Sequence, residues 1–228
     1  MRCVVTAGPT YEPLDEVRRL TNFSTGRLGI ELGNHLEAQG HEVTLLVGEQ
    51  ATWPGKRQVQ HVEVFTTTAD LSTRLAGWSG RRVQAVFHAA AVSDFAFGQI
   101  WSRSSTGELV EVHAGKISSR ESTLLAELRP TPKIIARLRG WFPRALIAGW
   151  KYEVDGDRRS VIAKARQQIR ANRMDACVAN GPAYGSGFGL VIPEGPATHL
   201  ADRAGLLAAL SRWLEKEEFD VSPIPSLS

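Results

Sequence analysis

Short apolar runs alternate with helix-like stretches along most of the chain. The run "VQAVFHAAAV" is typical of a central strand that is buried on both faces of a parallel sheet. Alternation of this kind predicts an α/β, Rossmann-like fold, a mostly parallel sheet with helices on both faces. We expect strands at 2–7, 41–48, 59–65, 83–92, 144–153 and 174–180, and helices at 24–39, 68–78, 131–141, 157–172 and 202–217.

Capping residues mark several helix ends. Ser24 is a candidate N-cap of the first helix, and Gly40 suits the C′ position at its other end. Thr131 is the expected cap of a later helix, with Pro132 at its first position. Residues 187–201 predict a hairpin before the closing helix.

One Ser- and Gly-rich segment interrupts the alternation between residues 94 and 130. A connection this long in a compact domain is usually functional or disordered, and we expect a long loop or hairpin arm at about 96–122. The rest predicts a single α/β domain over residues 1–218, followed by a flexible tail at 219–228.

Composition narrows the class of protein. The net charge is +3 and only six of the 27 basic residues are lysine, but no basic stripe interleaved with aromatic residues favours nucleic-acid binding. No apolar run approaches the roughly 18 residues of a membrane span, and the N-terminus lacks a signal-peptide pattern. Cys3 and Cys177 fall in expected buried strands, which fits free thiols in a reducing, cytoplasmic compartment.

The stretch "TNFSTGRLGIELGNHLEAQGHEV" places three glycines, Gly26, Gly29 and Gly33, in the first turns of a helix. Glycine there favours a nucleotide or phosphate site, although the same residues could only let the helix lie close on the sheet. The stretch does not match G-x-G-x-x-G, and no tyrosine has a lysine four positions later. A nicotinamide-dependent reductase is therefore disfavoured.

Other candidate site residues follow strands or lie in the arm. Small residues in "HAAAVSDF" leave room for a flat ligand, and Asp94 could hold a ribose hydroxyl or a metal, or only cap a turn. Lys116 in "GKISS" suits a phosphate clamp, the alternative being an exposed surface lysine. Trp150 and Asn180 end strands, and Trp150 could stack on a base or pack in the core.

Taken in order, "TAGPTYEPLDEVRRLTNFSTGRLG", "HAAAVSDF", "GKISS", "LRPTPKII", "GWKYE" and "VAN" resemble the phosphopantothenoylcysteine synthetase family. The similarity runs from about residue 3 to residue 216, and the first two motifs are the specific ones. The resemblance implies a free-standing ligase of coenzyme A biosynthesis without a flavin. It implies that ATP or CTP, with Mg²⁺, activates 4′-phosphopantothenate as an acyl-nucleotide that cysteine then captures.

The resemblance also assigns roles to residues of this chain. It implies that Asn22 hydrogen-bonds the acyl group, that Arg18 lies near the intermediate, and that Lys116 contacts the triphosphate. The implied nucleotide-binding residues are Gly8, Ala89, Ala90, Asp94, Lys116, Pro132, Lys133, Ile134, Ile135 and Trp150. The implied substrate-binding residues are Asn22, Ser24, Thr25, Gly26, Arg27 and Ala90. Metal ligands are not assigned.

The chain departs from the bacterial pattern of the family at several positions. Pro9 stands where many bacterial members have a second glycine, and Ser118 and Ser119 stand where many have lysines. The nucleotide is therefore left open between ATP and CTP. The resemblance implies a homodimer. Two alternatives stay open, a catalytically impaired nucleotide-binding regulatory homologue and a ligase acting on a different carboxylic acid.

Overall fold

The computed structural model describes residues 1–118 and 123–220, with side chains to residue 216. Its helices are α1 (Arg27–Ala38), α2 (Thr68–Gly77), α3 (Ile134–Trp141), α4 (Arg158–Asn172) and α5 (Arg203–Asp220). Its strands are β1 (Arg2–Ala7), β2 (Tyr11–Pro13), β3 (Arg19–Thr21), β4 (Glu42–Gly48), β5 (His61–Phe65), β6 (Ala85–His88), β7 (Phe95–Arg103), β8 (Leu109–Glu111), β9 (Leu124–Pro130), β10 (Leu146–Tyr152), β11 (Ala176–Asn180), β12 (Phe188–Val191) and β13 (Thr198–Leu200).

An eight-stranded sheet forms the centre of the molecule, in the order β13-β12-β11-β10-β6-β1-β4-β5. The six strands from β11 to β5 are parallel, and the expected terminal hairpin adds β12 and β13 antiparallel at one edge. From β1 the chain adds β4 and then β5 on one side of that strand. It then crosses back and adds β6 on the other side of β1. The predicted Rossmann-like α/β fold is confirmed.

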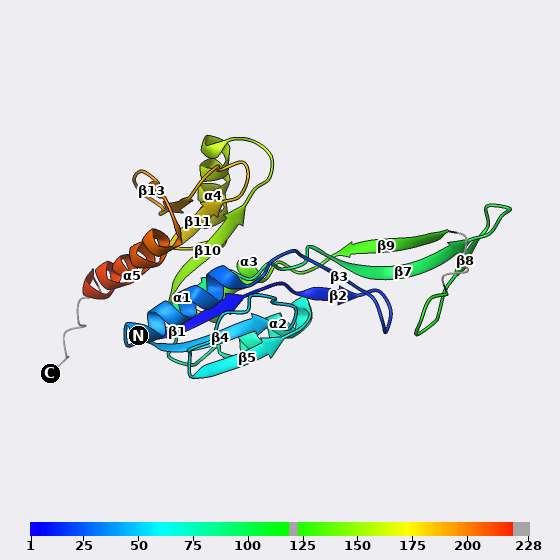
Figure 1. Ribbon diagram of the computed structural model, residues 1–228, viewed down its shortest axis with the longest axis horizontal. Coiled ribbons are helices and arrows are strands. Elements are labelled where there is room, and N and C mark those ends of the chain that lie inside the picture. Colours follow the sequence, from blue (N-terminus) through cyan, green and yellow to red (C-terminus); the bar gives the residue numbers. More distant parts are fainter. Residues whose placement is uncertain (119–122, 221–228) are drawn as a thin grey trace.

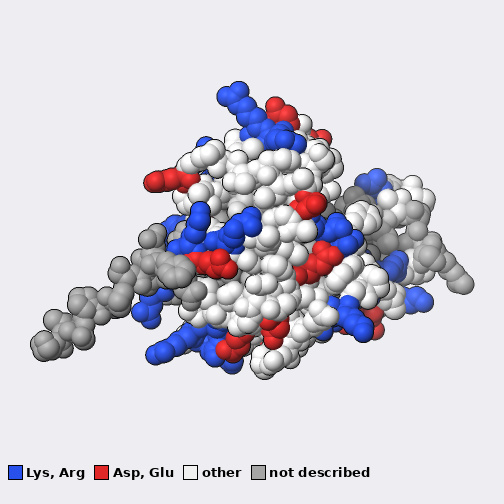
Figure 2. All heavy atoms as spheres, turned by 60° about the vertical axis from the view of Figure 1, so that its left-hand side comes forward, with Lys and Arg blue, Asp and Glu red and all other residues white. Residues whose placement is uncertain are grey.

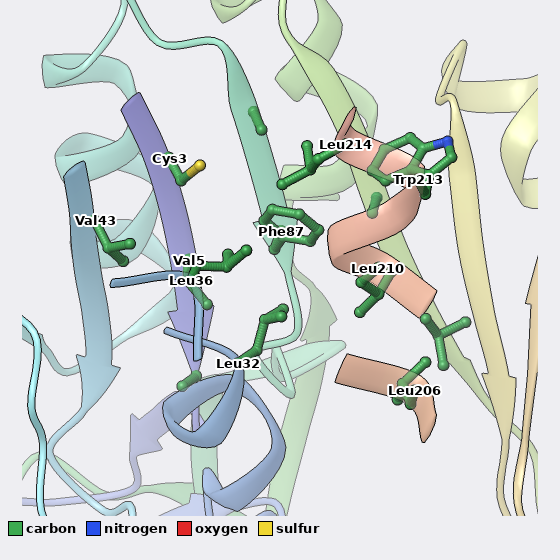
Figure 3. Packing of buried hydrophobic residues seen from close by; sticks show 14 of the residues in the cluster. Cys3, Val5, Leu32, Leu36, Val43, Phe87, Leu206, Leu210, Trp213 and Leu214 are labelled. Atoms are coloured by element: carbon green, nitrogen blue, oxygen red, sulfur yellow. The ribbon is translucent and has the colours of Figure 1, made fainter. Parts of the chain in front are cut away.

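Helices cover both faces of this sheet, because the apolar strands need partners on each side. Side chains of α1 and α5 join one buried cluster, and those of α2, α3 and α4 join the other. In the first cluster, Phe87 of β6 meets Trp213 of α5 edge to face, with ring centroids 6.2 Å apart. Figure 3 shows Leu206, Leu210 and Leu214 of α5 packed in the same cluster.

The first helix begins later than its capping pattern suggested. Its N-cap is Gly26, in the left-handed conformation at φ 77° and without a side-chain cap, so Ser24 is not the cap. Gly29 lies where a Cβ would come within 2.6 Å of the Ala7 Cβ and 2.8 Å of the Thr6 carbonyl oxygen. The chain therefore needs glycine at 29 to bring α1 onto β1. Gly40, at φ 83°, takes the expected C′ position.

The helix at 134–141 also corrects a prediction. Its N-cap is Lys133, so Thr131 is not the cap and Pro132 is not the first helical residue. The Thr131 hydroxyl donates instead to the carbonyl oxygen of Ser93, at 2.5 Å. By contrast, α2 has a threonine side-chain cap, since the Thr67 hydroxyl accepts the amide of Asp70.

Beyond the main sheet, the interrupted segment forms an arm. Strands β8, β7 and β9 make a three-stranded antiparallel sheet, longer than the hairpin expected at 96–122. A second hairpin of β2 and β3 leaves the main sheet beside it (Figure 1). Residues 119–122, with Ser119, lie outside the described part of the chain, as does most of the expected tail, while α5 continues to Asp220.

Both cysteines lie in strands that the structure buries, as expected from the sequence. Cys3 and Cys177 are buried, and neither forms a disulfide within the described residues. On the face shown in Figure 2, basic side chains are interspersed with acidic ones. Among the described helices, none is long and apolar enough to cross a membrane.

Candidate functional site

The carboxyl ends of β1 and β6 meet where the strand order of the sheet reverses. Open α/β sheets bind ligands at this topological switch point. After β1 the chain passes through Gly8, and after β6 it passes through Ala91. The Ala91 amide donates to the Gly8 carbonyl oxygen at 3.0 Å, and the Thr10 amide donates to the Ala91 carbonyl oxygen at 3.1 Å. The two loops are thus joined directly past the strand ends.

Asn22 is brought to the same point. Its side-chain amide donates to the carbonyl oxygen of Ala91 at 3.0 Å. Just before it, the Thr21 hydroxyl donates to the Thr10 carbonyl oxygen at 2.9 Å. The structure therefore places Asn22 beside the segment that contains Ala89 and Ala90, through a side-chain-to-backbone hydrogen bond between residues 69 positions apart in the sequence.

Glycine is required where two of these loops cross. Gly8 and Gly26 both have positive φ, at 82° and 77°. A Cβ on Gly26 would lie 3.2 Å from the Gly8 Cα and 2.9 Å from the Ala51 Cβ. Neither position tolerates a larger residue easily, because φ is left-handed and the space is filled. The loop before α1 therefore lies against the loop after β1.

A second group of expected residues gathers beside the first. The Ser93 amide donates to the Thr10 hydroxyl oxygen at 2.8 Å, and the Thr131 amide donates to the Asp94 carbonyl oxygen at 2.9 Å. The Asp94 carboxylate pairs with the ammonium of Lys133, with both side chains exposed. Residues 93–94 and 131–133 therefore form one hydrogen-bonded unit next to the switch point, and Ile134 and Ile135 continue from it into α3.

Trp150 is separated from that unit by the sheet. Its side chain packs with the cluster beneath α1 and α5, whereas Ile134 and Ile135 pack with the cluster beneath α2, α3 and α4. The strand alternation of β10 imposes this, since neighbouring side chains point to opposite faces. Core packing, the alternative use of Trp150, is what the structure favours. Its indole nitrogen is buried without a hydrogen-bond partner.

The remaining expected residues are spread along the loops and the arm. Ser24 and Thr25 accept backbone amides before α1, and Arg27 pairs with Glu31 one turn later at 2.7 Å. Lys116 is exposed in the arm. The Arg18 guanidinium contacts the backbone beside Lys116, away from the switch point, with its Nη2 2.6 Å from the Ile117 carbonyl oxygen.

A buried polar chain under the site had no clear signal in the sequence. The Ala90 amide donates to the Thr6 hydroxyl oxygen at 3.1 Å, and the same hydroxyl lies 3.0 Å from His88 Nδ1. Because Thr6 accepts from Ala90, its own proton is available to His88. Burial lowers the pKa of His88 to about 4, so the imidazole is neutral near pH 7. The only hint in the sequence was a polar residue near the carboxyl end of each of two apolar strands, Thr6 in β1 and His88 in β6.

A shallow depression of about 460 Å³ lies beyond β10 on the α4 side, lined by Lys151, Glu153, Lys164, Gln167, Gln168 and Ala171. Glu153 pairs with both lysines of this depression. The Lys164 ammonium, and then that of Lys151, hold the pKa of Glu153 below its usual range. The depression adds two cations near the carboxyl end of the sheet. Within the described residues, no group of three His, Cys, Asp or Glu side chains is placed to hold a metal ion.

Comparison with known proteins identifies the family of this chain. A model of the family described as the DNA/pantothenate metabolism flavoprotein C-terminal domain matches residues 1–191. The coenzyme A biosynthesis bifunctional protein CoaBC of Thermococcus kodakarensis is 34% identical over 186 residues, which are 81% of this chain and 42% of that protein. A cysteine/cysteine sulfinic acid decarboxylase from an unknown prokaryotic organism is 30% identical over 190 residues, 82% of this chain and 48% of that protein.

A solved structure is similar over nearly the whole length. The DNA/pantothenate metabolism flavoprotein of Streptococcus pneumoniae superposes with a TM-score of 0.81 at 26% identity, covering 95% of this chain and 99% of that one. The chain spans less than half the length of the two curated relatives. The family match over most of the chain, the shared fold and the motif order agree, and the chain belongs to the DNA/pantothenate metabolism flavoprotein C-terminal domain family, which its sequence already resembled.

Proposed function

We propose that this protein is a phosphopantothenate–cysteine ligase. The observation that carries the proposal is the convergence of Asn22 on the Ala91 carbonyl at the switch point of the sheet. It lies within the motifs that resemble the synthetases. The similarity to a bifunctional protein of coenzyme A biosynthesis supports the pathway.

The proposed reaction has two steps. The carboxylate of 4′-phosphopantothenate attacks the α-phosphorus of ATP or CTP, a new acyl–phosphate bond forms, and pyrophosphate leaves. The amine of cysteine then attacks the acyl carbon, the amide forms, the nucleoside monophosphate leaves, and the amine gives up a proton. Because both first-step reactants are anionic, the site must offset their charge.

The residues at the switch point suit the acyl group. The Asn22 side-chain amide has a second N–H besides the one bonded to Ala91, because an amide nitrogen carries two donors. In the proposal this second N–H polarises the acyl oxygen. The small side chains of Ala89 and Ala90 leave the strand end open, and Gly26 and its neighbours Ser24, Thr25 and Arg27 are proposed to line the phosphopantothenate.

The nucleotide is proposed to lie over residues 93–94 and 132–135. The Asp94 carboxylate would accept a hydrogen bond from a ribose hydroxyl and would give up part of its contact with Lys133. Lys116 would contact the triphosphate. Mg²⁺ would screen the phosphate oxygens and, as is usual for this ion, would be held largely by the phosphates themselves. By the resemblance, Trp150 is also proposed to contact the nucleotide, from the other face of the sheet near the carboxyl end of β10.

We also propose a homodimer. The exposed apolar side chains on the hairpin and arm support it, since large apolar patches on a surface usually mark an interface. These side chains are Val17 at 61%, Leu20 at 41%, Phe95 at 44%, Leu109 at 50%, Val110 at 53% and Leu128 at 48% exposure.

The proposal is tested by the product and by a matched pair of lysine variants. Mass spectrometry should detect phosphopantothenoylcysteine when the protein is incubated with Mg²⁺, 4′-phosphopantothenate, cysteine and ATP or CTP. Lys116→Gln should slow pyrophosphate release, whereas Lys56→Gln, an exposed lysine outside the arm, should not. Nucleotide binding without pyrophosphate release would favour the regulatory homologue. Release that ignores phosphopantothenate would favour a different acid.

A further inference from the structure

The tip of the β2–β3 hairpin contains a carboxylate that is almost fully enclosed. The Asp15 side chain is 1% exposed. Its Oδ1 accepts the amides of Val17 at 2.9 Å and Arg18 at 2.8 Å, and its Oδ2 lies 2.7 Å from the Arg18 guanidinium. Burial alone would raise the pKa of Asp15, but the backbone amides of Val17 and Ile117, with Arg18, outweigh it and lower the pKa to about 2. Asp15 is therefore ionised at any physiological pH.

This carboxylate also binds a segment about a hundred residues away. Asp15 Oδ2 accepts the amide of Ile117 at 3.1 Å, and Arg18 Nη2 donates to the Ile117 carbonyl oxygen at 2.6 Å. On the other side of Lys116, the carbonyl oxygen of Gly115 accepts the amide of Glu16 at 2.9 Å. The hairpin tip thus holds the backbone on both sides of Lys116, while the lysine side chain is left exposed.

The same hairpin leads directly to the switch point. Strand β3 connects Arg18 to Asn22, so their Cα atoms are roughly 13 Å apart at the usual rise of a strand. That separation excludes a direct contact between the hairpin tip and Asn22, but an extended phosphate-bearing ligand and a long lysine side chain can bridge it. One hairpin therefore places both Asn22 and the backbone of Lys116.

We propose that Asp15 is a positioning residue, which with Arg18 docks the segment 115–117 on the hairpin so that Lys116 is presented to the phosphates of the nucleotide. The role of Lys116 rests on the proposed function, whereas the docking rests on the contacts alone. Arg18 acts in this proposal through the arm backbone and does not touch the acyl group.

The docking is tested without any activity measurement. Endoproteinase Lys-C cleaves after lysine, and cleavage at Lys116 would give fragments 1–116 and 117–228. Because proteolysis requires local opening, Asp15→Ala should accelerate cleavage at Lys116 by about tenfold or more, as expected for loss of hydrogen bonds to a charged group. Glu108→Gln, an exposed carboxylate on the same arm, should leave the rate unchanged. Cleavage at Lys56 is the internal control.

Arg18→Ala guards against a folding defect. It removes both the bond to the Ile117 carbonyl and the ion pair with Asp15, so it should also accelerate cleavage at Lys116. Thermal unfolding should stay close to that of the parent protein, because both contacts lie in the hairpin and the arm, outside the main sheet. Equal cleavage at Lys116 in the parent protein and in both variants would overturn the docking. Faster amide exchange at Ile117 in Asp15→Ala would support it.

The positioning role is tested by a double-mutant cycle on nucleotide binding. Titration calorimetry with Mg²⁺ and ATP, and with Mg²⁺ and CTP, should show weaker binding in Asp15→Ala and in Lys116→Gln. If Asp15 acts through Lys116, Asp15→Ala should add nothing in the Lys116→Gln background. A full additional loss in that background would overturn the positioning role. Failure of the parent protein to bind either nucleotide would overturn the role and the proposed function together, while the cleavage result would still decide the docking.

Discussion

Replacing Gly29 and Gly33 with alanine, one at a time, separates two explanations for the glycines of α1. They either make room for a ligand or let the helix pack closely on the sheet. Both positions lie inside the helix, where glycine is disfavoured relative to alanine by roughly 1 kcal/mol. They differ in what a new methyl group meets. At Gly29 it would lie 2.6 Å from the Ala7 Cβ and 3.0 Å from the Ala7 Cα, whereas at Gly33 the nearest atom is a Val59 methyl at 3.5 Å.

The expected effects have opposite signs. Gly33→Ala makes only ordinary contacts and should stabilise the fold by about 0.5–1 kcal/mol through helix propensity and reduced entropy of the unfolded chain. Gly29→Ala gains the same term but overpacks against strand backbone that has no rotamer to change, at a cost of typically 1–3 kcal/mol. A net destabilisation of about 1–2 kcal/mol is expected for Gly29→Ala.

Urea unfolding followed by circular dichroism measures both changes. With a slope of about 3 kcal/mol per molar urea, the midpoints of the two variants should differ by roughly 0.5–1 M. A midpoint for Gly29→Ala equal to or above that of Gly33→Ala would refute the close approach of α1 to β1. The glycine at 29 would then have to be explained by a ligand and not by packing.

Three further predictions follow from the site. The pKa of His88 is about 4 in the folded protein, against the ordinary value of 6.5 that applies to the unfolded chain. The free energy of unfolding should therefore fall by up to about 1.4 kcal/mol per pH unit as the pH drops from 6.5 towards 4. The urea midpoint of His88→Asn should lack this pH dependence, and an unchanged dependence would exclude His88 as its source. Asn22→Asp should still form the acyl-nucleotide but slow its capture by cysteine roughly a hundredfold, and equal loss in both steps would count against the proposed role. Leu128→Asp should shift the sedimenting species from dimer to monomer and Val62→Asp should not, because Leu128 lies on the arm and Val62 on edge strand β5; a dimer that survives Leu128→Asp would move the interface elsewhere.

Sequence patterns were sufficient for the elements that depend on local periodicity. The parallel strands, the main helices and the buried cysteines follow from apolar runs and their spacing, and the structure has them close to the expected positions. Caps were less predictable. Thr131 has the right chemistry for a cap, but a tertiary acceptor, the carbonyl of Ser93, takes its hydroxyl instead.

The candidate site, like the fold, could be predicted only in part from the sequence. Motif order brought Asn22 and Ala90 into one hypothesis, and the structure joins their segments through Ala91. Trp150 shows where prediction from the sequence fails, because a shift of one position along a strand decides which face of the sheet a side chain packs on. The docking of Ile117 on Asp15 spans 102 residues and uses a backbone amide, which no sequence pattern reveals.

In the proposed function, the switch-point site activates the carboxylate of 4′-phosphopantothenate with a nucleoside triphosphate. The most direct test is pyrophosphate release in the absence of cysteine, measured over a single turnover with Mg²⁺ and either ATP or CTP. Pyrophosphate should be released with at least one nucleotide, this release should require phosphopantothenate, and no product amide should form until cysteine is added. No release from protein that binds the nucleotide, or release that does not require phosphopantothenate, would contradict it.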